Sequence, residues 1–175
     1  AIDSNGTNVF MISIFANDHQ MIEYLMTTDI DITSVNTDGV NALMMAVKHR
    51  DLKLVKMLFE TGKFNVNLVN NKRYSAYLIA VENNCMDIMI YLEKCGALID
   101  AVNIRGENAY AIAYECKYDE MLTYFKTNYP ELDIFGAKLK EFEIILEDEM
   151  ECLICNVCDG NTYITCGKHI YHSEC

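Results

Sequence analysis

The stretch Val35-Asn36-Thr37-Asp38-Gly39, followed by Asn41-Ala42-Leu43-Met44-Met45-Ala46-Val47, recurs along the chain, and this recurrence identifies the architecture. Equivalents of its first part occupy residues 2–6, 69–73 and 102–106, and an Asn or Ser with an apolar run follows each of them. The fifth positions, Gly6, Gly39, Arg73 and Gly106, are 33, 34 and 33 residues apart. A period of this length is typical of a solenoid, in which each repeat is one small supersecondary unit.

The residues after each turn predict two helices per repeat. The apolar runs begin at residues that are good N-caps, since their side chains can accept a hydrogen bond from an unpaired backbone N–H: Asn8, Asn41, Ser75 and Asn108. Each run also contains a small residue that lets neighbouring helices approach closely: Ser13, Ala46, Ala80 and Ala113. A second run, at 21–25, 54–58, 88–92 and 121–125, has apolar residues at i, i+1 and i+4, which form one face of a helix.

These units resemble the ankyrin repeat family. Residues 39–47 stand where that family has Gly-x-Thr-Pro-Leu-His-x-Ala-Ala, and residues 96–101 stand where it has Gly-Ala-Asp-Val-Asn-Ala. The resemblance implies an all-α ankyrin-repeat solenoid over residues 1–132, with about four repeats at approximately 1–34, 35–68, 69–101 and 102–132. Every repeat lacks the Thr-Pro pair, and the His position holds Met11, Met44, Leu78 or Ala111, so we expect a weakened capping network.

Stacked repeats bury a continuous core and need polar caps at their ends. Because Ala1 already lies inside the first turn unit, we expect upstream repeats or an N-terminal cap. The family also implies a concave protein-binding face, made of hairpin tips and first helices. On that face we expect Asn5, Asp38, Lys72, Arg73 and Arg105, backed by Ile12, Met45, Ile79 and Ile112. The same residues would also be ordinary loop tips and ordinary apolar filler.

The period is lost after residue 132, and residues 133–150 are predicted to be an acidic linker or helix. Leu139, Phe142, Ile145 and Leu146 have helical spacing, although Phe142, Ile144 and Leu146 also alternate as in a strand. The acidic run at 147–151 is interpreted as a solvated linker face, with a partner-docking segment as the alternative.

Residues 151–175 contain a pattern of candidate zinc ligands. Two-residue gaps let a tight knuckle direct two Cys or His side chains at one ion, and six residues have this spacing: Cys152, Cys155, Cys166, His169, His172 and Cys175. Cys158 also has ligand spacing from Cys155, so a simpler single-ion knuckle stays open, as do free or redox-active thiols.

The order of these ligands resembles the RING finger family in its two-histidine variant. That resemblance implies a cross-braced pair of sites. Cys152, Cys155, His172 and Cys175 would complete the first site, and Cys166 with His169 would form half of the second. We therefore expect one complete Zn²⁺ site, in a partial RING-like finger that is truncated at its sixth ligand, with another ligand pair beyond Cys175.

The two resemblances together imply a RING-type ubiquitin ligase. Such a protein has no covalent catalytic residue: its repeats bind the substrate, and its zinc module recruits a ubiquitin-conjugating enzyme, which Ile154 would contact. The mechanism would be proximity and orientation. The alternative is a non-enzymatic ankyrin adaptor with a structural zinc knuckle. Metal-assisted hydrolysis is disfavoured, because a closed set of ligands lacks the open position and general base that it needs.

Composition restricts the partners further. The net charge of −12 and the pI near 4.6 would repel nucleic-acid phosphates, and no apolar stretch approaches the roughly 20 residues of a membrane span. Cys85, Cys95 and Cys116 lie in helical patterns at unrelated spacings, and we interpret them as small core residues rather than disulfide partners. We therefore expect an intracellular protein, cytoplasmic or nuclear, with protein partners.

Overall fold

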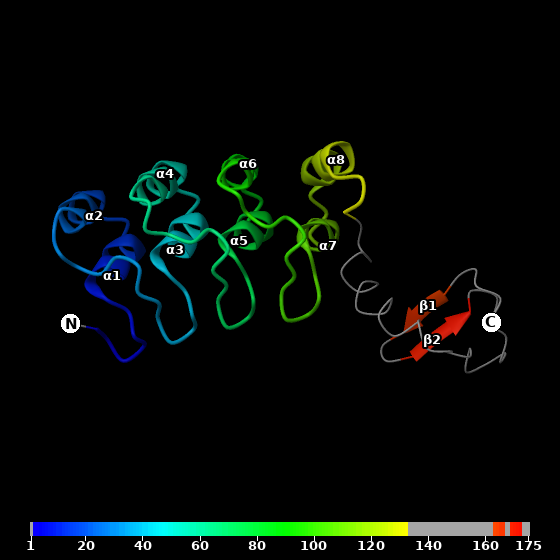
Figure 1. Cartoon of the computed structure of the whole chain (residues 1–175), viewed down its shortest axis with the longest axis horizontal. Helices are drawn as coiled ribbons and strands as arrows, with labels where there is room; N and C mark the ends of the chain where they lie inside the picture. Colours follow the sequence, from blue (N-terminus) through cyan, green and yellow to red (C-terminus); the bar gives the residue numbers. More distant parts are fainter. Residues whose placement is uncertain (1, 133–162, 167–168, 173–175) are drawn as a thin grey trace. The chain divides into compact units, whose positions relative to one another are not determined.

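The computed structural model describes residues 2–132, 163–166 and 169–172, with side chains for the first range (Figure 1). Contacts between Cα atoms divide the chain into two units, Ala1–Ala137 and Lys138–Cys175. Each unit is described by itself.

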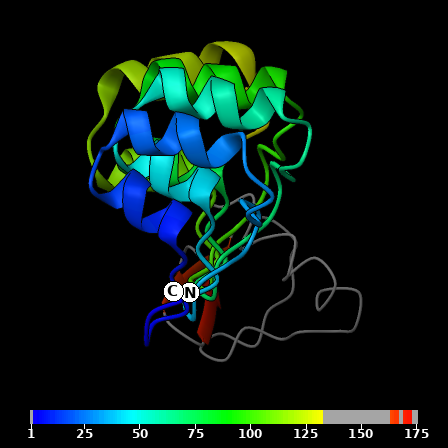
Figure 2. The same cartoon turned by 90° about the vertical axis from the view of Figure 1, so that its left-hand side faces the viewer.

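The first unit is a row of four helix pairs within residues 2–132. The pairs are α1 (Val9–Phe15) with α2 (His19–Met26), α3 (Ala42–Lys48) with α4 (Leu52–Glu60), α5 (Ala76–Glu82) with α6 (Met86–Lys94), and α7 (Ala109–Glu115) with α8 (Asp119–Asn128). The first helices form one layer and the second helices another, and the loops between pairs all project on the same side (Figures 1 and 2). The predicted all-α solenoid of four repeats is confirmed.

The predicted N-caps of the first helices are confirmed as well. The side-chain oxygens of Asn8, Asn41 and Asn108 accept hydrogen bonds of 2.8–2.9 Å from the backbone N–H three residues on, and Ser75 accepts one of 3.3 Å. The expectation of a weakened capping network was therefore wrong at this position. Asn or Ser replaces the usual Thr because any short side-chain acceptor satisfies the same orphan donor.

A continuous apolar core runs between the two helix layers, from Phe10 to Phe125. The small residues Ser13, Ala46, Ala80 and Ala113 are all buried, as the sequence predicted. The cysteines behave differently from one another: Cys85 is buried, Cys95 is partly buried and Cys116 is exposed. The interpretation of Cys116 as a core residue was wrong, because it caps the C-terminal end of α7 at the solvent side of the turn into α8.

Each projecting loop is held by one Asp or Asn side chain. The Oδ1 atoms of Asp3, Asn36, Asn70 and Asn103 accept hydrogen bonds from the backbone N–H groups two and four residues on. The turn also needs a left-handed residue at the fifth position: Gly6, Gly39 and Gly106 supply it, and Arg73 adopts it with φ 59°. We refer to these four loops as the hairpin loops.

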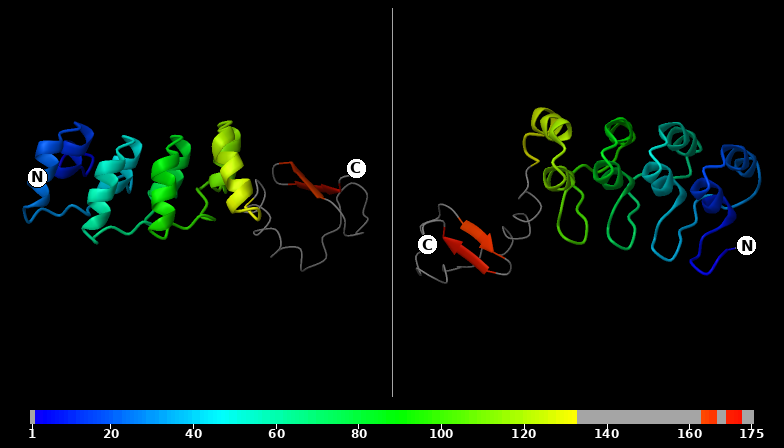
Figure 3. Two further views of the ribbon diagram at one scale, coloured as in Figure 1. Left: turned by 90° about the horizontal axis from the view of Figure 1, so that it is seen from above. Right: turned by 180° about the vertical axis from the view of Figure 1, so that it is seen from behind.

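Neighbouring hairpin loops are joined by hydrogen bonds between their backbones. Thr37 N donates to Asn5 O at 2.9 Å, Asn71 N to Asp38 O at 2.9 Å, and Ile104 N to Lys72 O at 3.1 Å. At Gly39 a Cβ atom would lie 3.0 Å from Asn71 N, so glycine allows this close approach. The loops therefore form a connected surface beside the first helices, and all of them lie on one side of the solenoid (Figure 3).

The second unit contains the strands β1 (Tyr163–Cys166) and β2 (His169–His172) among the residues described there. They pair antiparallel, with Tyr163 opposite His172 and Cys166 opposite His169. The predicted linker or helix at 133–150, including Leu139, Phe142, Ile145 and Leu146, and the acidic run that follows it, lies outside the described residues. No helix in the described part of the chain is long and apolar enough to cross a membrane.

Candidate protein-binding groove

A groove of about 860 Å³ lies between the hairpin loops and the first helices of the solenoid. Phe15, Met44, Met45, Lys48, Ile79 and Glu82 line it from α1, α3 and α5. Loop residues complete the lining: Asn36, Asp38, Val40, His49, Asn70, Lys72, Tyr74, Asn83, Ile104 and Arg105. We call this feature the hairpin groove; it has an apolar floor and a charged rim.

The groove brings together most, but not all, of the residues that the sequence predicted for a binding face. Asp38, Lys72 and Arg105 line it, with Met45 and Ile79 behind them. Two predicted loop residues, Asn5 and Arg73, are exposed but do not line it. Ile12 is 47% exposed outside the groove, and Ile112 is buried in the core. The groove therefore belongs to the second, third and fourth hairpin loops.

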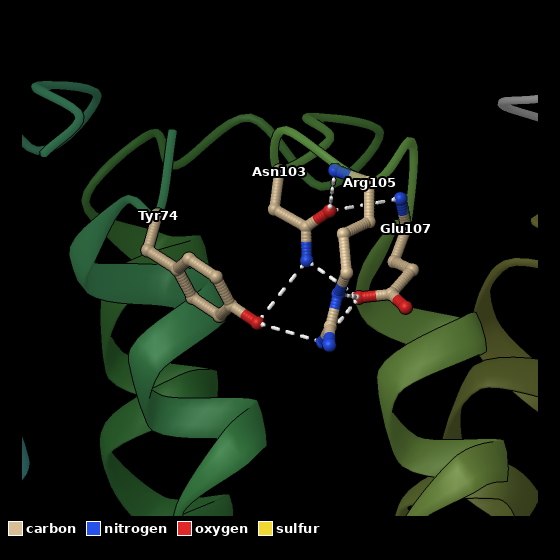
Figure 4. Close-up of polar contacts among 4 residues, drawn as sticks. All are labelled: Tyr74, Asn103, Arg105 and Glu107. Atoms are coloured by element: carbon tan, nitrogen blue, oxygen red, sulfur yellow. Dashed lines mark hydrogen bonds and ion pairs between the residues drawn. The ribbon is translucent and has the colours of Figure 1, made fainter. Parts of the chain in front are cut away.

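One wall of the groove carries a polar network that joins the third and fourth hairpin loops (Figure 4). Glu107 accepts hydrogen bonds from Asn103 Nδ2 at 2.7 Å and Arg105 Nε at 2.8 Å, and its Oε2 lies 2.7 Å from Arg105 Nη2. Tyr74 Oη accepts from Asn103 Nδ2 at 3.1 Å and from Arg105 Nη2 at 3.4 Å. These contacts fix the guanidinium of Arg105 next to the Tyr74 hydroxyl.

Burial differs sharply among the members of this network. Asn103, Glu107 and Tyr74 are buried, whereas the Arg105 side chain is 63% exposed. The hydrogen bond to Glu107 raises the pKa of Arg105, and burial raises the pKa of Tyr74. At neutral pH the wall therefore presents a fixed cation and a protonated phenol.

The other charged residues on the rim are not neutralised within the solenoid. Neither Lys48 nor Lys72 has an ion-pair partner among residues 2–132, where the ion pairs are His19–Asp51, Lys53–Glu23 and Arg105–Glu107. The acids Asp38 and Glu82 also line the groove. A chain with a net charge of −12 thus gathers three of its 14 Lys and Arg residues at one groove.

A second polar cluster lies at α6 and α8 and does not line the groove. Glu93 accepts hydrogen bonds from the hydroxyls of Tyr77 at 2.8 Å, Tyr124 at 2.6 Å and Tyr129 at 3.1 Å. Tyr77 is fully buried, and burial raises the pKa of Tyr77 and Tyr124 strongly. Three neutral phenols around one carboxylate form a structural tie between the third and fourth repeats.

Sequence reasoning did not find either cluster, although a signal for the first exists. Tyr74 and Glu107 occupy the position four residues after the loop Asn, where the earlier repeats have Thr7 and Val40. A change from Thr and Val to Tyr and then Glu at one position of a repeat marks a place where adjacent repeats contact each other differently. For Glu93 the partners are 16, 31 and 36 residues away, and no local pattern predicts them.

The predicted zinc ligands lie in the second unit. Cys166, His169 and His172 fall on β1 and β2, and the strand register sets Cys166 opposite His169. Cys152, Cys155, Cys158, Cys175 and the predicted contact residue Ile154 lie outside the described residues. Within the described ranges no three His, Cys, Asp or Glu residues are grouped so that they could hold a metal ion.

Comparison with known proteins supports the repeat architecture. A family model described as "Ankyrin repeats (3 copies)" matches residues 1–70. The chain is 29% identical over 133 residues to alpha-latroinsectotoxin-Lt1a of Latrodectus tredecimguttatus, an alignment that covers 71% of this chain and 9% of the toxin. It is 30% identical over 74 residues to Notch-regulated ankyrin repeat-containing proteins of Danio rerio and Xenopus laevis, covering 42% of this chain and 65% and 64% of theirs.

Proposed function

Because residues 2–132 form an ankyrin-repeat solenoid, we propose that the chain is a protein-interaction module that binds a segment of a partner protein in the hairpin groove. The observation that carries this proposal is the groove itself. It has a volume of about 860 Å³ and is lined by residues of three hairpin loops and of the first helices α1, α3 and α5. Its apolar floor and charged rim suit a segment that inserts side chains while its backbone stays near the loops.

A peptide selection on the whole chain tests this proposal. Peptides selected from a random display library would be synthesised, and their dissociation constants measured by fluorescence anisotropy. We expect Met45→Lys, which adds a charge to the groove floor, to weaken binding at least tenfold, because desolvating that charge costs more than about 1.4 kcal/mol.

Met57→Lys is the matched control. Met57 is also a partly exposed methionine, but it lies on α4 and does not line the groove. We expect it to change the dissociation constant less than twofold, with unchanged helical circular dichroism in both variants. Equal binding to the wild type and to Met45→Lys would contradict the assignment of the groove.

We propose further that residues 151–175 form a RING-like zinc module and that the chain acts as a ubiquitin ligase whose repeats bind the substrate. The register of β1 and β2 favours this reading, because it brings the backbone positions of Cys166 and His169 opposite each other. Thiolate and imidazole donors are those that Zn²⁺ prefers. The chain spans less than two thirds of the length of the relatives it matches, and ligase activity is proposed from these residues alone.

In this proposal Cys152, Cys155, His172 and Cys175 hold one Zn²⁺, and Cys166 with His169 belong to a second site. The ion supplies a structural brace and takes no part in bond making. Ile154 contacts a ubiquitin-conjugating enzyme, while the hairpin groove holds the substrate. Catalysis then consists of keeping an acceptor lysine near the enzyme-bound thioester. The free thiols of Cys85, Cys95 and Cys116 suit a reducing compartment, the cytoplasm or nucleus.

Autoubiquitylation by the whole chain with a panel of conjugating enzymes tests the ligase proposal. We expect Cys155→Ala to abolish activity and to lose the one equivalent of zinc per chain that elemental analysis should find in the wild type. Cys116→Ala, which removes an exposed cysteine of the solenoid, should keep both. Zinc binding without activity toward any enzyme would contradict the ligase and leave an adaptor with a structural metal.

A further inference from the structure

The hydroxyl of Tyr74 and the guanidinium of Arg105 meet on the wall of the hairpin groove, and Lys72 lines the same groove. The Tyr74 hydroxyl lies 3.4 Å from Arg105 Nη2, and Figure 4 shows the guanidinium between the Tyr74 hydroxyl and the Glu107 carboxylate. Lys72 is on the neighbouring loop, where its carbonyl accepts the N–H of Ile104, the residue before Arg105. All three donor residues line the groove.

Within the described solenoid, the side chains of Tyr74, Arg105 and Lys72 can only donate further hydrogen bonds. Tyr74 Oη accepts two hydrogen bonds, and its own hydrogen has no acceptor among residues 2–132. Arg105 uses Nε and one terminal nitrogen on Glu107, so its other terminal nitrogen has no partner in the same range. Lys72 likewise has no ion pair there. A buried hydroxyl together with two cations in this state is complementary to a ligand that only accepts hydrogen bonds.

The charged and apolar residues that line the groove indicate which hydrogen-bond acceptor a ligand would carry. Three cations, Lys48, Lys72 and Arg105, and two acids, Asp38 and Glu82, line the groove. Their sum is one positive charge (+3 − 2), which a monoanion balances and a dianion such as phosphate exceeds. Two apolar side chains, Met45 and Ile79, line the same groove. A carboxylate next to an apolar side chain therefore matches both the donors and the floor.

We propose that the hairpin groove selects partner segments in which an Asp or Glu carboxylate is held by Tyr74, Arg105 and Lys72, beside an apolar side chain that packs on Met45 and Ile79. This inference rests on the proposed protein-binding function and names the chemistry of its partner. Glu107 and Asn103 act as positioning residues, since they hold Arg105 and Tyr74 rather than the partner.

The peptides selected on the whole chain provide the probe. We expect them to share an acidic residue adjacent to an apolar one, and replacing that acid by its amide should weaken binding about tenfold, as expected for a charged hydrogen bond. With Lys72→Gln, the same replacement in the peptide should cost only about threefold, because one of the donors is gone. Arg73→Gln is the matched control, since it removes the same charge from the adjacent residue outside the groove, and it should keep the tenfold effect.

Several outcomes would overturn the proposal. Selected peptides without enrichment in Asp or Glu, or an equal loss with Lys72→Gln and Arg73→Gln, would exclude a specific carboxylate site. Tighter binding of a peptide with phosphoserine in place of the acid would assign the donors to phosphate instead. Peptides that bind, that lose affinity with Met45→Lys and that keep their affinity when the acid is replaced by its amide would contradict only this inference. If no peptide loses affinity with Met45→Lys, the proposed protein-binding groove is contradicted as well.

Discussion

Replacing Arg105 by alanine is expected to lower the free energy of unfolding clearly more than replacing an exposed arginine without a partner, since it leaves the carboxylate of Glu107 buried with no cation. Glu107 is 7% exposed and would keep one side-chain donor, Asn103 Nδ2. A second change, Glu107→Gln in the Arg105→Ala background, should recover part of this loss, because it removes the negative charge that has lost its cation. Urea unfolding of the whole chain, followed by circular dichroism at 222 nm, measures both.

Arg73→Ala is the control for this pair. Arg73 is exposed on the adjacent hairpin loop and has no ion pair among residues 2–132, so its removal should change the free energy of unfolding by less than about 0.5 kcal/mol. A loss for Arg105→Ala no larger than that for Arg73→Ala, or a further loss when Glu107→Gln is added, would show that the ion pair does not stabilise the loops.

Glu93→Ala, on the opposite side of the solenoid, is expected to lower the free energy of unfolding by about 3 kcal/mol. It removes the acceptor of three tyrosine hydroxyls at once, and the hydroxyl of Tyr77 has no access to water because that residue is fully buried. An unsatisfied buried hydroxyl costs roughly 1–3 kcal/mol, and charge-assisted hydrogen bonds add to the loss. The measurement is again urea unfolding.

Two further variants serve as comparisons for Glu93→Ala. Glu93→Gln keeps an acceptor oxygen for Tyr77 and should lose about half as much as Glu93→Ala, roughly 1.5 kcal/mol. Glu60→Ala removes an exposed glutamate from the end of α4 and should change the free energy of unfolding by less than about 0.5 kcal/mol. Equal effects of Glu93→Ala and Glu60→Ala would mean that the tyrosines find other partners and that the tie contributes nothing.

The Glu93 cluster joins two repeats, and the Arg105 network reaches the neighbouring repeat through Tyr74. Contacts between repeats were the least accessible to sequence reasoning. The period, the two helices of each repeat and the caps at Asn8, Asn41, Ser75 and Asn108 could be predicted, because each depends on residues close together in the chain. The burial or exposure of the cysteines could not be predicted in the same way. Cys85 and Cys116 both follow first helices, yet Cys85 is buried and Cys116 is exposed.

The candidate site was likewise predicted only in part from the sequence. Sequence placed Asp38, Lys72 and Arg105 on one face because they occupy loop tips of successive repeats. It also placed Asn5, Arg73, Ile12 and Ile112 there, and none of these lines the groove. A residue's position in the repeat fixes its loop, but neighbouring positions on a tight turn point in different directions. The predicted zinc ligands stay a prediction.

The sequence by itself therefore determined the repeat, its helices and their caps, since these follow from local hydrogen bonding and a period that every unit shares. Only the tertiary structure decided which side chains meet between units: Tyr74 with Arg105, and Glu93 with Tyr124 and Tyr129. The physical reason is that stacking makes neighbours of residues about one period apart. Which of those neighbours form hydrogen bonds depends on burial and side-chain direction, and a repeating pattern does not encode either.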